Sequence, residues 1–137
     1  MTSKTTKDNS KKKRILIVDD ESDVDMVLKR VFEQSGFNAD SYDDPILALE
    51  NFKAGSYDLV LLDIKMPEMD GFNLYQKMKK IDSKINVCFL TASELYYERF
   101  RKEFSTLDKD LFIRKPIENE ELIKRINTIL ARLYNNI

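Results

Sequence analysis

Polar side chains directly follow several short apolar runs of this chain, and their types define the chemistry that it can support. Asp19 and Asp20 follow residues 15–18, Asp63 follows 59–62, Thr91 follows 87–90, and Lys115 comes shortly after 111–113. Three carboxylates brought together repel one another unless a cation joins them. Oxygen ligands without His or Cys suit Mg²⁺. A carboxylate beside a divalent cation, a lysine and a hydroxyl is equipped for phosphoryl transfer, with the carboxylate as nucleophile.

The elements that must position these residues follow from the pattern of apolar positions. Apolar runs alternate with helical patterns, which is typical of a parallel α/β fold. We expect strands at 15–18, 37–42, 59–62, 87–90 and 111–113. The first helix should be capped by Ser22 or Asp23 and stopped by Gly36, and the second should begin at Pro45 and end by Gly55. Further helices are expected after Gly71, over 94–107 and over about 119–134. The first helix should bury Val24, Val27, Leu28, Val31 and Phe32 on one face. Since sites in such folds form beyond the carboxyl ends of the strands, the five polar side chains should gather at one edge of the sheet.

Each residue taken alone has an ordinary structural interpretation. The pair Asp19–Asp20 resembles a helix cap, Asp63 a turn residue, and Lys115 with the following proline a common strand exit, while Thr91 alone says little. The second strand leads into Asp43–Asp44, which we interpret as a helix cap. The functional interpretation rests on the set, because its members follow four different strands.

Composition narrows the possible classes of protein. The 137 residues fit one domain. Residues 1–14 carry six basic side chains and one acidic, so 6 − 1 = +5, which leaves −6 on the rest of a chain with a net charge of −1. Residues 1–13 are therefore expected to form a disordered basic arm and 14–137 the folded domain. Nucleic-acid binding by the acidic body is not favoured, because such binding depends on clustered Lys and Arg.

The single cysteine and the lack of histidine exclude several chemistries. There is no histidine, which rules out a Ser-His-Asp triad, His-ligated zinc and a phosphohistidine on this chain. Cys88 lies in an apolar run and cannot form an intrachain disulfide, as expected of a cytoplasmic protein. No stretch reaches the length of a membrane span, so membrane insertion is not expected.

The longer motifs resemble those of a known family. The runs ILIVDDE at 15–21 and DLVLLDIKMP at 58–67, with Asp70-Gly71, Thr91-Ala92 and Lys115-Pro116, resemble the receiver domains of response regulators. The resemblance covers about residues 14–134. It implies a flavodoxin-like (βα)5 three-layer sandwich with a parallel sheet in the order 2-1-3-4-5. It also implies a phosphorelay partner, either a sensor histidine kinase or a histidine phosphotransfer protein.

By the same resemblance, each site residue acquires a role. Asp63 would be the phosphoacceptor. Asp20 and Asp63 would bind Mg²⁺ together with the backbone carbonyl of Lys65, and Asp19 would act through water. Lys115 would pair with the phosphoryl group, Thr91 would hydrogen-bond to it, and Phe112 would be the switch aromatic. In similar proteins Thr91 moves inward on phosphorylation and the aromatic follows. The face made by the fourth helix, fifth strand and fifth helix, which would bind a downstream target protein, is thereby reshaped.

Two parts of the chain depart from the common pattern of the family: the segment from Thr91 to Lys115, and Lys65. From Thr91 to Lys115 the chain is slightly long, and the Gly-Ala pair usual before the fifth strand is missing. The fourth helix is rich in aromatics, and at least one of Tyr96 and Tyr97 should face outward. This suggests either a modified partner-binding face or rings that fill the gap. Lys65 either hinders the water that hydrolyses the acyl phosphate or is simply solvated.

Three other functions remain open at this stage. A stand-alone switch is expected, since no effector segment follows the last helix, but a relay intermediate that passes the phosphoryl group on has the same sequence. A magnesium-dependent phosphatase with an aspartyl nucleophile is disfavoured, because Lys65 stands where such enzymes usually have a general acid. An interaction module that takes no phosphate is disfavoured by the complete site.

Overall fold

Five parallel strands form one sheet in the order β2-β1-β3-β4-β5, which confirms the expected topology. The computed structural model describes residues 12–135. The strands are β1 (Arg14–Val18), β2 (Asn38–Tyr42), β3 (Leu59–Leu62), β4 (Val87–Thr91) and β5 (Phe112–Arg114). The helices are α2 (Ser22–Gln34), α3 (Pro45–Asn51), α4 (Gly71–Ile81), α5 (Leu95–Glu103) and α6 (Asn119–Asn135), with a short 3₁₀ turn η1 (Lys109–Leu111) before β5.

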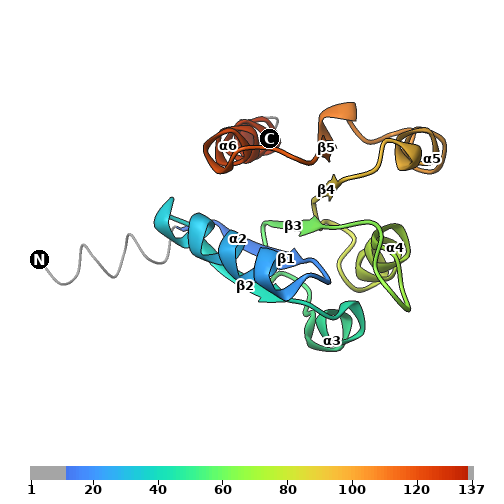
Figure 1. Ribbon diagram of the computed structural model, residues 1–137, viewed down its shortest axis with the longest axis horizontal. Helices are drawn as coiled ribbons and strands as arrows, with labels where there is room; N and C mark the ends of the chain where they lie inside the picture. Colours follow the sequence, from blue (N-terminus) through green and yellow to red (C-terminus); the bar gives the residue numbers. More distant parts are fainter. Residues whose placement is uncertain (1–11, 136–137) are drawn as a thin grey trace, which may run out of the picture.

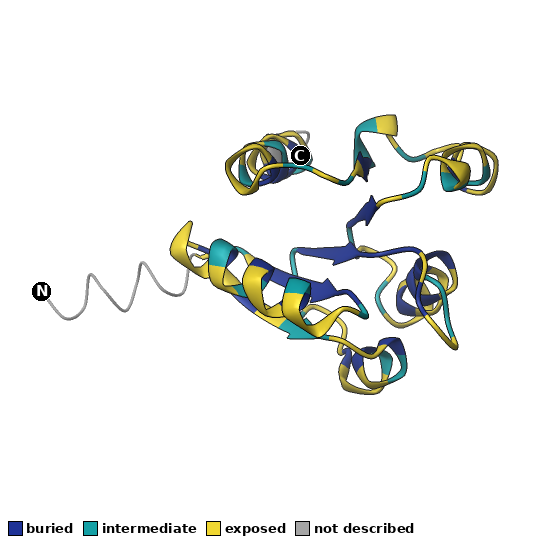
Figure 2. Cartoon of the chain, in the orientation of Figure 1, coloured by how far each residue is buried: buried dark blue, intermediate teal, exposed yellow. Residues whose placement is uncertain are grey.

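The helices cover both faces of the sheet and make the three expected layers. Helices α2 and α6 lie on one face, and α3, α4 and α5 lie on the other (Figure 1). Strands β1, β3 and β4 are apolar and buried on both faces, as Figure 2 shows, because helices leave neither face open to water. Strand β2 lies at an edge and is more polar. The flavodoxin-like (βα)5 fold is therefore confirmed.

Short polar side chains set where two of the helices begin. Asp44 accepts hydrogen bonds from the backbone N–H groups of Ile46 and Leu47 at the start of α3, which confirms it as a cap. Asp70 caps α4 through the N–H of Asn73 at 2.8 Å. The expected cap at Ser22 or Asp23 is wrong, because α2 begins at Ser22 itself and Glu21 precedes it without a side-chain cap.

The expected extent of the fourth helix needs correction, whereas two other expectations hold. Helix α5 spans Leu95–Glu103 rather than 94–107, since the chain turns at Phe104 and Leu107 bonds back to it. Helix α3 ends at Asn51, which agrees with the expected end by Gly55. Cys88 is fully buried, which raises the pKa of its thiol to about 12. The predicted arm at 1–13 falls outside the described residues except for its last two.

None of the helices within residues 12–135 combines the length and apolarity needed to cross a bilayer.

Candidate functional site

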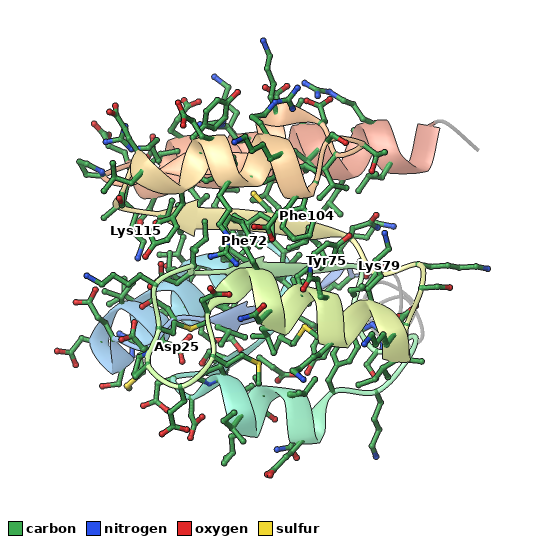
Figure 3. All side chains as sticks on the ribbon, turned by 90° about the vertical axis from the view of Figure 1, so that its right-hand side faces the viewer. Asp25, Phe72, Tyr75, Lys79, Phe104 and Lys115 are labelled. Atoms are coloured by element: carbon green, nitrogen blue, oxygen red, sulfur yellow. The ribbon has the colours of Figure 1, made fainter. Side chains whose placement is uncertain are left out.

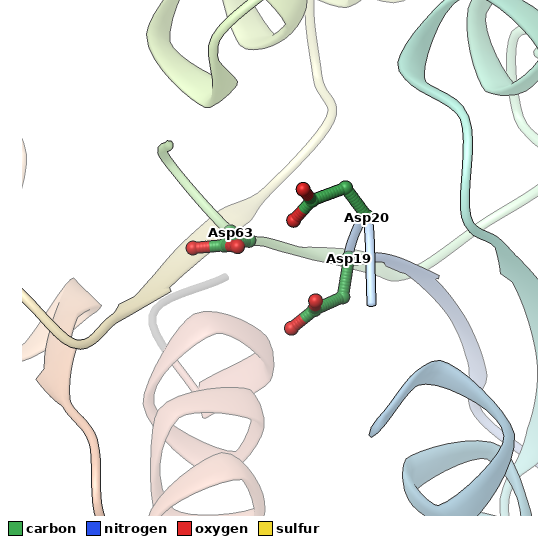
Figure 4. Close-up of side chains that lie close together, drawn as sticks. All are labelled: Asp19, Asp20 and Asp63. Atoms are coloured by element: carbon green, nitrogen blue, oxygen red, sulfur yellow. The ribbon is translucent and has the colours of Figure 1, made fainter. Parts of the chain in front are cut away.

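Three carboxylates meet where β1 and β3 end. Val18 pairs with Leu62 in the sheet, and the N–H of Asp63 bonds to the carbonyl of Val18 at 2.9 Å, so the residues after both strands lie at one level. Each of Asp19, Asp20 and Asp63 offers an oxygen, and these oxygens lie within 4.8 Å of one another. Figure 4 shows the three side chains gathered beyond the two strands. The juxtaposition expected from parallel strands is confirmed.

The surroundings of Asp63 disfavour its charged form relative to an ordinary aspartate. Burial raises its pKa to about 7, and the negative charges of Asp19 and Asp20 act in the same direction. The charge of Lys115 and the N–H of Ile64, which donates to Asp63 Oδ1 at 2.8 Å, act in the opposite direction. A bound cation would favour the carboxylate further, since it supplies positive charge beside the group.

Lys115 contributes the positive charge of the site. Its Nζ lies 2.7 Å from Oδ2 of the buried Asp19. Burial disfavours the ammonium, but the hydrogen bond to Asp19 and the charges of Asp19 and Asp63 outweigh burial and raise the pKa of Lys115. The lysine is therefore charged at neutral pH. It is placed by β5, whose end returns to the sheet through the bond from the N–H of Lys115 to the carbonyl of Thr91 at 2.8 Å.

Thr91 closes the site from β4. It is 1% exposed, and its Oγ1 accepts a hydrogen bond from the N–H of Ser93 at 3.3 Å, which leaves the hydroxyl proton available to another acceptor. An open cavity of about 540 Å³ lies in front of these groups. It is lined by Asp20, Glu21, Asp63, Lys65, Met66, Pro67, Thr91, Ala92, Ser93 and Lys115. Lys65 is exposed at its rim, while the part played by its carbonyl stays a prediction.

The segment that carries Asp63 into α4 depends on a glycine. The N–H of Gly71 bonds to the carbonyl of Ile64 at 2.8 Å. A Cβ at Gly71 would overlap the carbonyl oxygen of Asp63 and crowd Cα of Ile64. The Asp70-Gly71 motif therefore has two separate uses. Asp70 starts the helix, and Gly71 lets that helix lie against the backbone of the aspartate.

The predicted switch aromatic lies beneath the aromatic surface of α5. Phe112 is 7% exposed, and its ring packs against Tyr97 and Phe100 with centroids 5.2 and 5.3 Å apart. Tyr97 is 38% exposed, which confirms that one of the two adjacent tyrosines faces outward. Tyr96 is half-buried and packs edge-on against Phe72. Thr91 and Phe112 thus stand on neighbouring strands, one facing the site and the other covered by α5.

The donor set fits a hard divalent cation. It consists of carboxylate oxygens, and burial with mutual repulsion already raises the pKa of Asp63. Such a group of acids is stabilised by a cation that accepts oxygen ligands, as Mg²⁺ does. This is the one such cluster of three or more acidic, His or Cys ligands found within residues 12–135.

The sequence pattern of the response regulator receiver domain matches residues 15–127 of the chain. The protein belongs to the response regulator receiver family. It is thus a signalling domain of two-component systems.

One curated relative and two solved structures show the extent of the similarity. The transcriptional regulatory protein RprY of Bacteroides fragilis is 34% identical over 126 residues, which are 92% of this chain and 52% of RprY. Among solved structures, a CheY-like receiver domain protein from Methanospirillum hungatei is 25% identical, with a TM-score of 0.74 over 92% of this chain and 99% of that one. TrrA from Thermotoga maritima, solved in complex with Mg²⁺-BeF, is 30% identical, with a TM-score of 0.69 over 85% of this chain and 97% of TrrA. The chain spans about half the length of the curated relatives it matches.

Sequence reasoning missed one buried acid of this receiver. Asp25 is 4% exposed, and burial raises its pKa to about 7. Its Oδ1 has no hydrogen-bond partner among residues 12–135. Figure 3 places Asp25 toward the same end of the molecule as Lys115. Asp25 lies at helical spacing from Leu28 and Phe32 on the buried face of α2, but the apolar pattern of the helix does not mark an acid as part of that face.

Proposed function

We propose that this receiver accepts a phosphoryl group on Asp63 from a phosphohistidine of a partner protein and thereby switches a protein-binding face. The observation that carries the proposal is the convergence of three carboxylates, a charged lysine and a threonine hydroxyl around one open cavity. Receivers act between histidine kinases and effectors, and the partner would therefore be a sensor histidine kinase or a histidine phosphotransfer protein. TrrA, which was solved with Mg²⁺-BeF, lends support from a relative.

In the proposed reaction, an oxygen of Asp63 attacks the phosphorus atom. An O–P bond forms, the N–P bond to the partner's imidazole breaks, and the imidazole nitrogen keeps the electron pair. Mg²⁺, held by Asp20, Asp63 and the carbonyl of Lys65 with Asp19 acting through water, would neutralise charge on the phosphoryl oxygens. The residues of the chain provide the rest.

Lys115 would act by changing its ion-pair partner from Asp19 to an oxygen of the phosphoryl group. It pairs with Asp19 in the structure, and Lys115 lines the same cavity as Asp63. An incoming phosphoryl group adds negative charge in that cavity, so the ammonium would pair with it. The Thr91 hydroxyl, whose oxygen is already held by Ser93, would donate its proton to a phosphoryl oxygen.

The switch would act through the aromatic surface of α5. Movement of Thr91 toward the phosphoryl group would open space beside Phe112, on which Tyr97 rests. Rearrangement of these rings would change the face formed by α5, β5 and α6, to which the exposed Leu95 and Tyr97 contribute. A downstream target protein that reads this face would then distinguish the two states.

The phosphodonor would approach beside α2. An open groove of about 730 Å³ runs between α2 and the segment that joins β5 to α6, and it shares Ala92 and Lys115 with the cavity of the site. Its walls are mainly apolar, and Val27 is 53% exposed at its edge. A partner that delivers a phosphoryl group to Asp63 would contact this groove.

The test is incubation of the chain with Mg²⁺ and a small acyl-phosphate donor, followed by intact mass measurement. We expect the mass of one phosphoryl group to be added to the parent and to be absent in Asp63→Asn. Omission of Mg²⁺ should prevent labelling of the parent. Labelling of Asp63→Asn as strong as that of the parent would refute the assignment. Onward transfer of the label to a histidine phosphotransfer protein would identify a relay intermediate, and tighter target binding after labelling would identify a switch.

A further inference from the structure

Helix α5 is fastened to the segment between β3 and α4 by one arginine. Nη1 of Arg99 lies 3.2 Å from Oδ2 of Asp70. Among the hydrogen bonds and ion pairs found in residues 12–135, this is the only one that joins α5 to the segment carrying Asp63 into α4. The same guanidinium bonds through Nε to Glu103 within α5 at 2.5 Å. Arg99 therefore has one partner in its own helix and one across the molecule.

Asp70 belongs to the backbone unit that holds the acceptor aspartate. Its Oδ1 caps α4, and its Oδ2 receives Arg99, so both oxygens are engaged. The next residue, Gly71, bonds to Ile64 and lies against the backbone of Asp63. A shift of the acceptor backbone thus reaches Asp70 across two short contacts, without passing through Thr91.

The guanidinium is also held in place by an aromatic ring. It lies over Phe72 with 4.8 Å between the guanidinium carbon and the ring centroid. Phe72 packs edge-on against Phe89 of β4 and Tyr96 of α5, at 5.0 and 6.2 Å. Figure 3 shows Phe72 and Phe104 between α4 and α5. An arginine with one face on a ring and its nitrogens on two carboxylates has few alternative positions, which makes the contact directional.

The start of α5 has a separate attachment. Glu94, just before the helix, forms an ion pair with Arg114 at the end of β5, next to Lys115. Helix α5 is thus tied to β5 at its start and to the acceptor segment by Arg99 in its middle. Movement of one attachment relative to the other would tilt the helix.

We infer that Arg99 is a positioning residue that sets where α5 lies relative to the acceptor segment 63–71. Under the proposed function, on which this second part rests, the Arg99–Asp70 pair carries a change at Asp63 to α5 along a route separate from that of Thr91 and Phe112. The protein-binding face would then be set by two contacts with the phosphorylation site.

Hydrogen–deuterium exchange of the full chain tests the attachment without any ligand. Asp70→Asn keeps a side chain that caps α4 but loses the ion pair, and Arg99→Met keeps an apolar stem over Phe72. Each variant should speed exchange in both segments, 95–103 and 64–70, by about two- to fivefold, the range that partly exposed ion pairs allow. The double variant should exchange no faster than either single one, and Arg99→Lys should restore part of the protection.

Matched controls separate this role from general loss of helix stability. Glu103→Gln removes only the partner within α5, and it should leave exchange in 64–70 unchanged. Arg101→Met removes another α5 arginine, which bonds to the carbonyl of Leu107, and should also leave 64–70 unchanged. Unchanged exchange of α5 in Asp70→Asn, or equal loosening of 64–70 by Glu103→Gln, would overturn the inference.

Amide NMR with Mg²⁺ and beryllofluoride tests the route. In the parent, signals from the site and from 95–103 should shift. In Asp70→Asn the shifts at 95–103 should be smaller, while those around Thr91 and Lys115 persist. Full shifts at 95–103 in Asp70→Asn would exclude the route. If the parent shows no shift at the site, the proposed function fails, whereas the exchange measurements still decide the attachment.

Discussion

Replacement of Asp25 by asparagine should stabilise the domain, and only above acidic pH. The carboxyl is 4% exposed and lies on the buried face of α2 with Leu28 and Phe32. Burial is the main reason why its pKa is raised to about 7, and the charges of Asp19 and Asp43 add to the effect while the Ser41 hydroxyl opposes it. The ionised form is therefore disfavoured in the folded protein relative to the unfolded chain.

The sign and size follow from the two pKa values. Below pH 3.8 the group is protonated in both states and costs nothing. As the pH rises from 3.8 to about 7, the unfolded chain releases the proton more readily, so the free energy of unfolding falls, and above pH 7 the loss is complete. At ~1.4 kcal/mol for each pH unit, the loss is at most ~4 kcal/mol. Asparagine has nearly the same shape and no charge, so Asp25→Asn should recover ~2–4 kcal/mol at pH 8 and little at pH 4.

Urea unfolding of parent and variant between pH 4 and pH 9, without Mg²⁺, measures this difference. Asp63 also titrates in this range, but it is common to both proteins, so the difference between their curves isolates Asp25. Asp23→Asn is the matched control, because Asp23 lies in the same helix turn and is exposed, so this variant removes a carboxylate without removing a buried one. If the Asp25→Asn curve runs parallel to the parent curve from pH 5 to pH 8, the reasoning about its burial is wrong.

Three further changes probe the site and its surroundings. Gly71→Ala should lower the free energy of unfolding by ~1–3 kcal/mol and slow labelling by acyl phosphate, because its Cβ overlaps the carbonyl of Asp63; an unchanged urea midpoint and rate would contradict the close contact. Lys65→Asn should shorten the life of the phosphoryl group if the lysine at the cavity rim hinders water, and an unchanged decay of the label by mass measurement would mean that it is merely solvated. Val27→Asp should slow transfer from a phosphorylated histidine protein but leave labelling by a small acyl phosphate unaltered, since it changes only the groove beside α2; equal slowing of both reactions would argue against donor docking there.

Much of the fold was predictable, because the strands and helices of a parallel α/β fold have distinct sequence patterns. Strands β1, β3 and β4 are buried on both faces, so their sequences are short continuous apolar runs rather than alternating ones. The polar edge strand β2 and the caps gave weaker signals. The end of α5 was misjudged, because Phe104 and Leu107 continue the apolar spacing of the helix although they lie in the turn after it.

The assumption of an amphipathic face also failed in one helix. Val27 fits the apolar pattern of α2 but is 53% exposed, whereas Asp25 breaks the pattern and is buried. Hydrophobicity alone cannot distinguish these cases, because the orientation of a helix is set by all of its contacts with β1, β2 and α6. Val27 instead lines the groove that α2 forms with the segment before α6.

By itself, the sequence determined which chemical groups this receiver brings to its candidate site. Asp19, Asp20, Asp63 and Lys115 directly follow strands and Thr91 ends one. Because parallel strands end at one edge of a sheet, the meeting of these side chains follows from topology. Only the tertiary structure decided which of these groups form ion pairs and which other side chains are buried or bridged near them. Two ion pairs, Lys115 with Asp19 and Arg99 with Asp70, join residues that are far apart in the chain. The burial of Asp25 depends on the orientation of α2, which the apolar pattern of the helix does not reveal. Such contacts depend on distances of a few ångströms between packed elements, which the periodicity of a sequence does not contain.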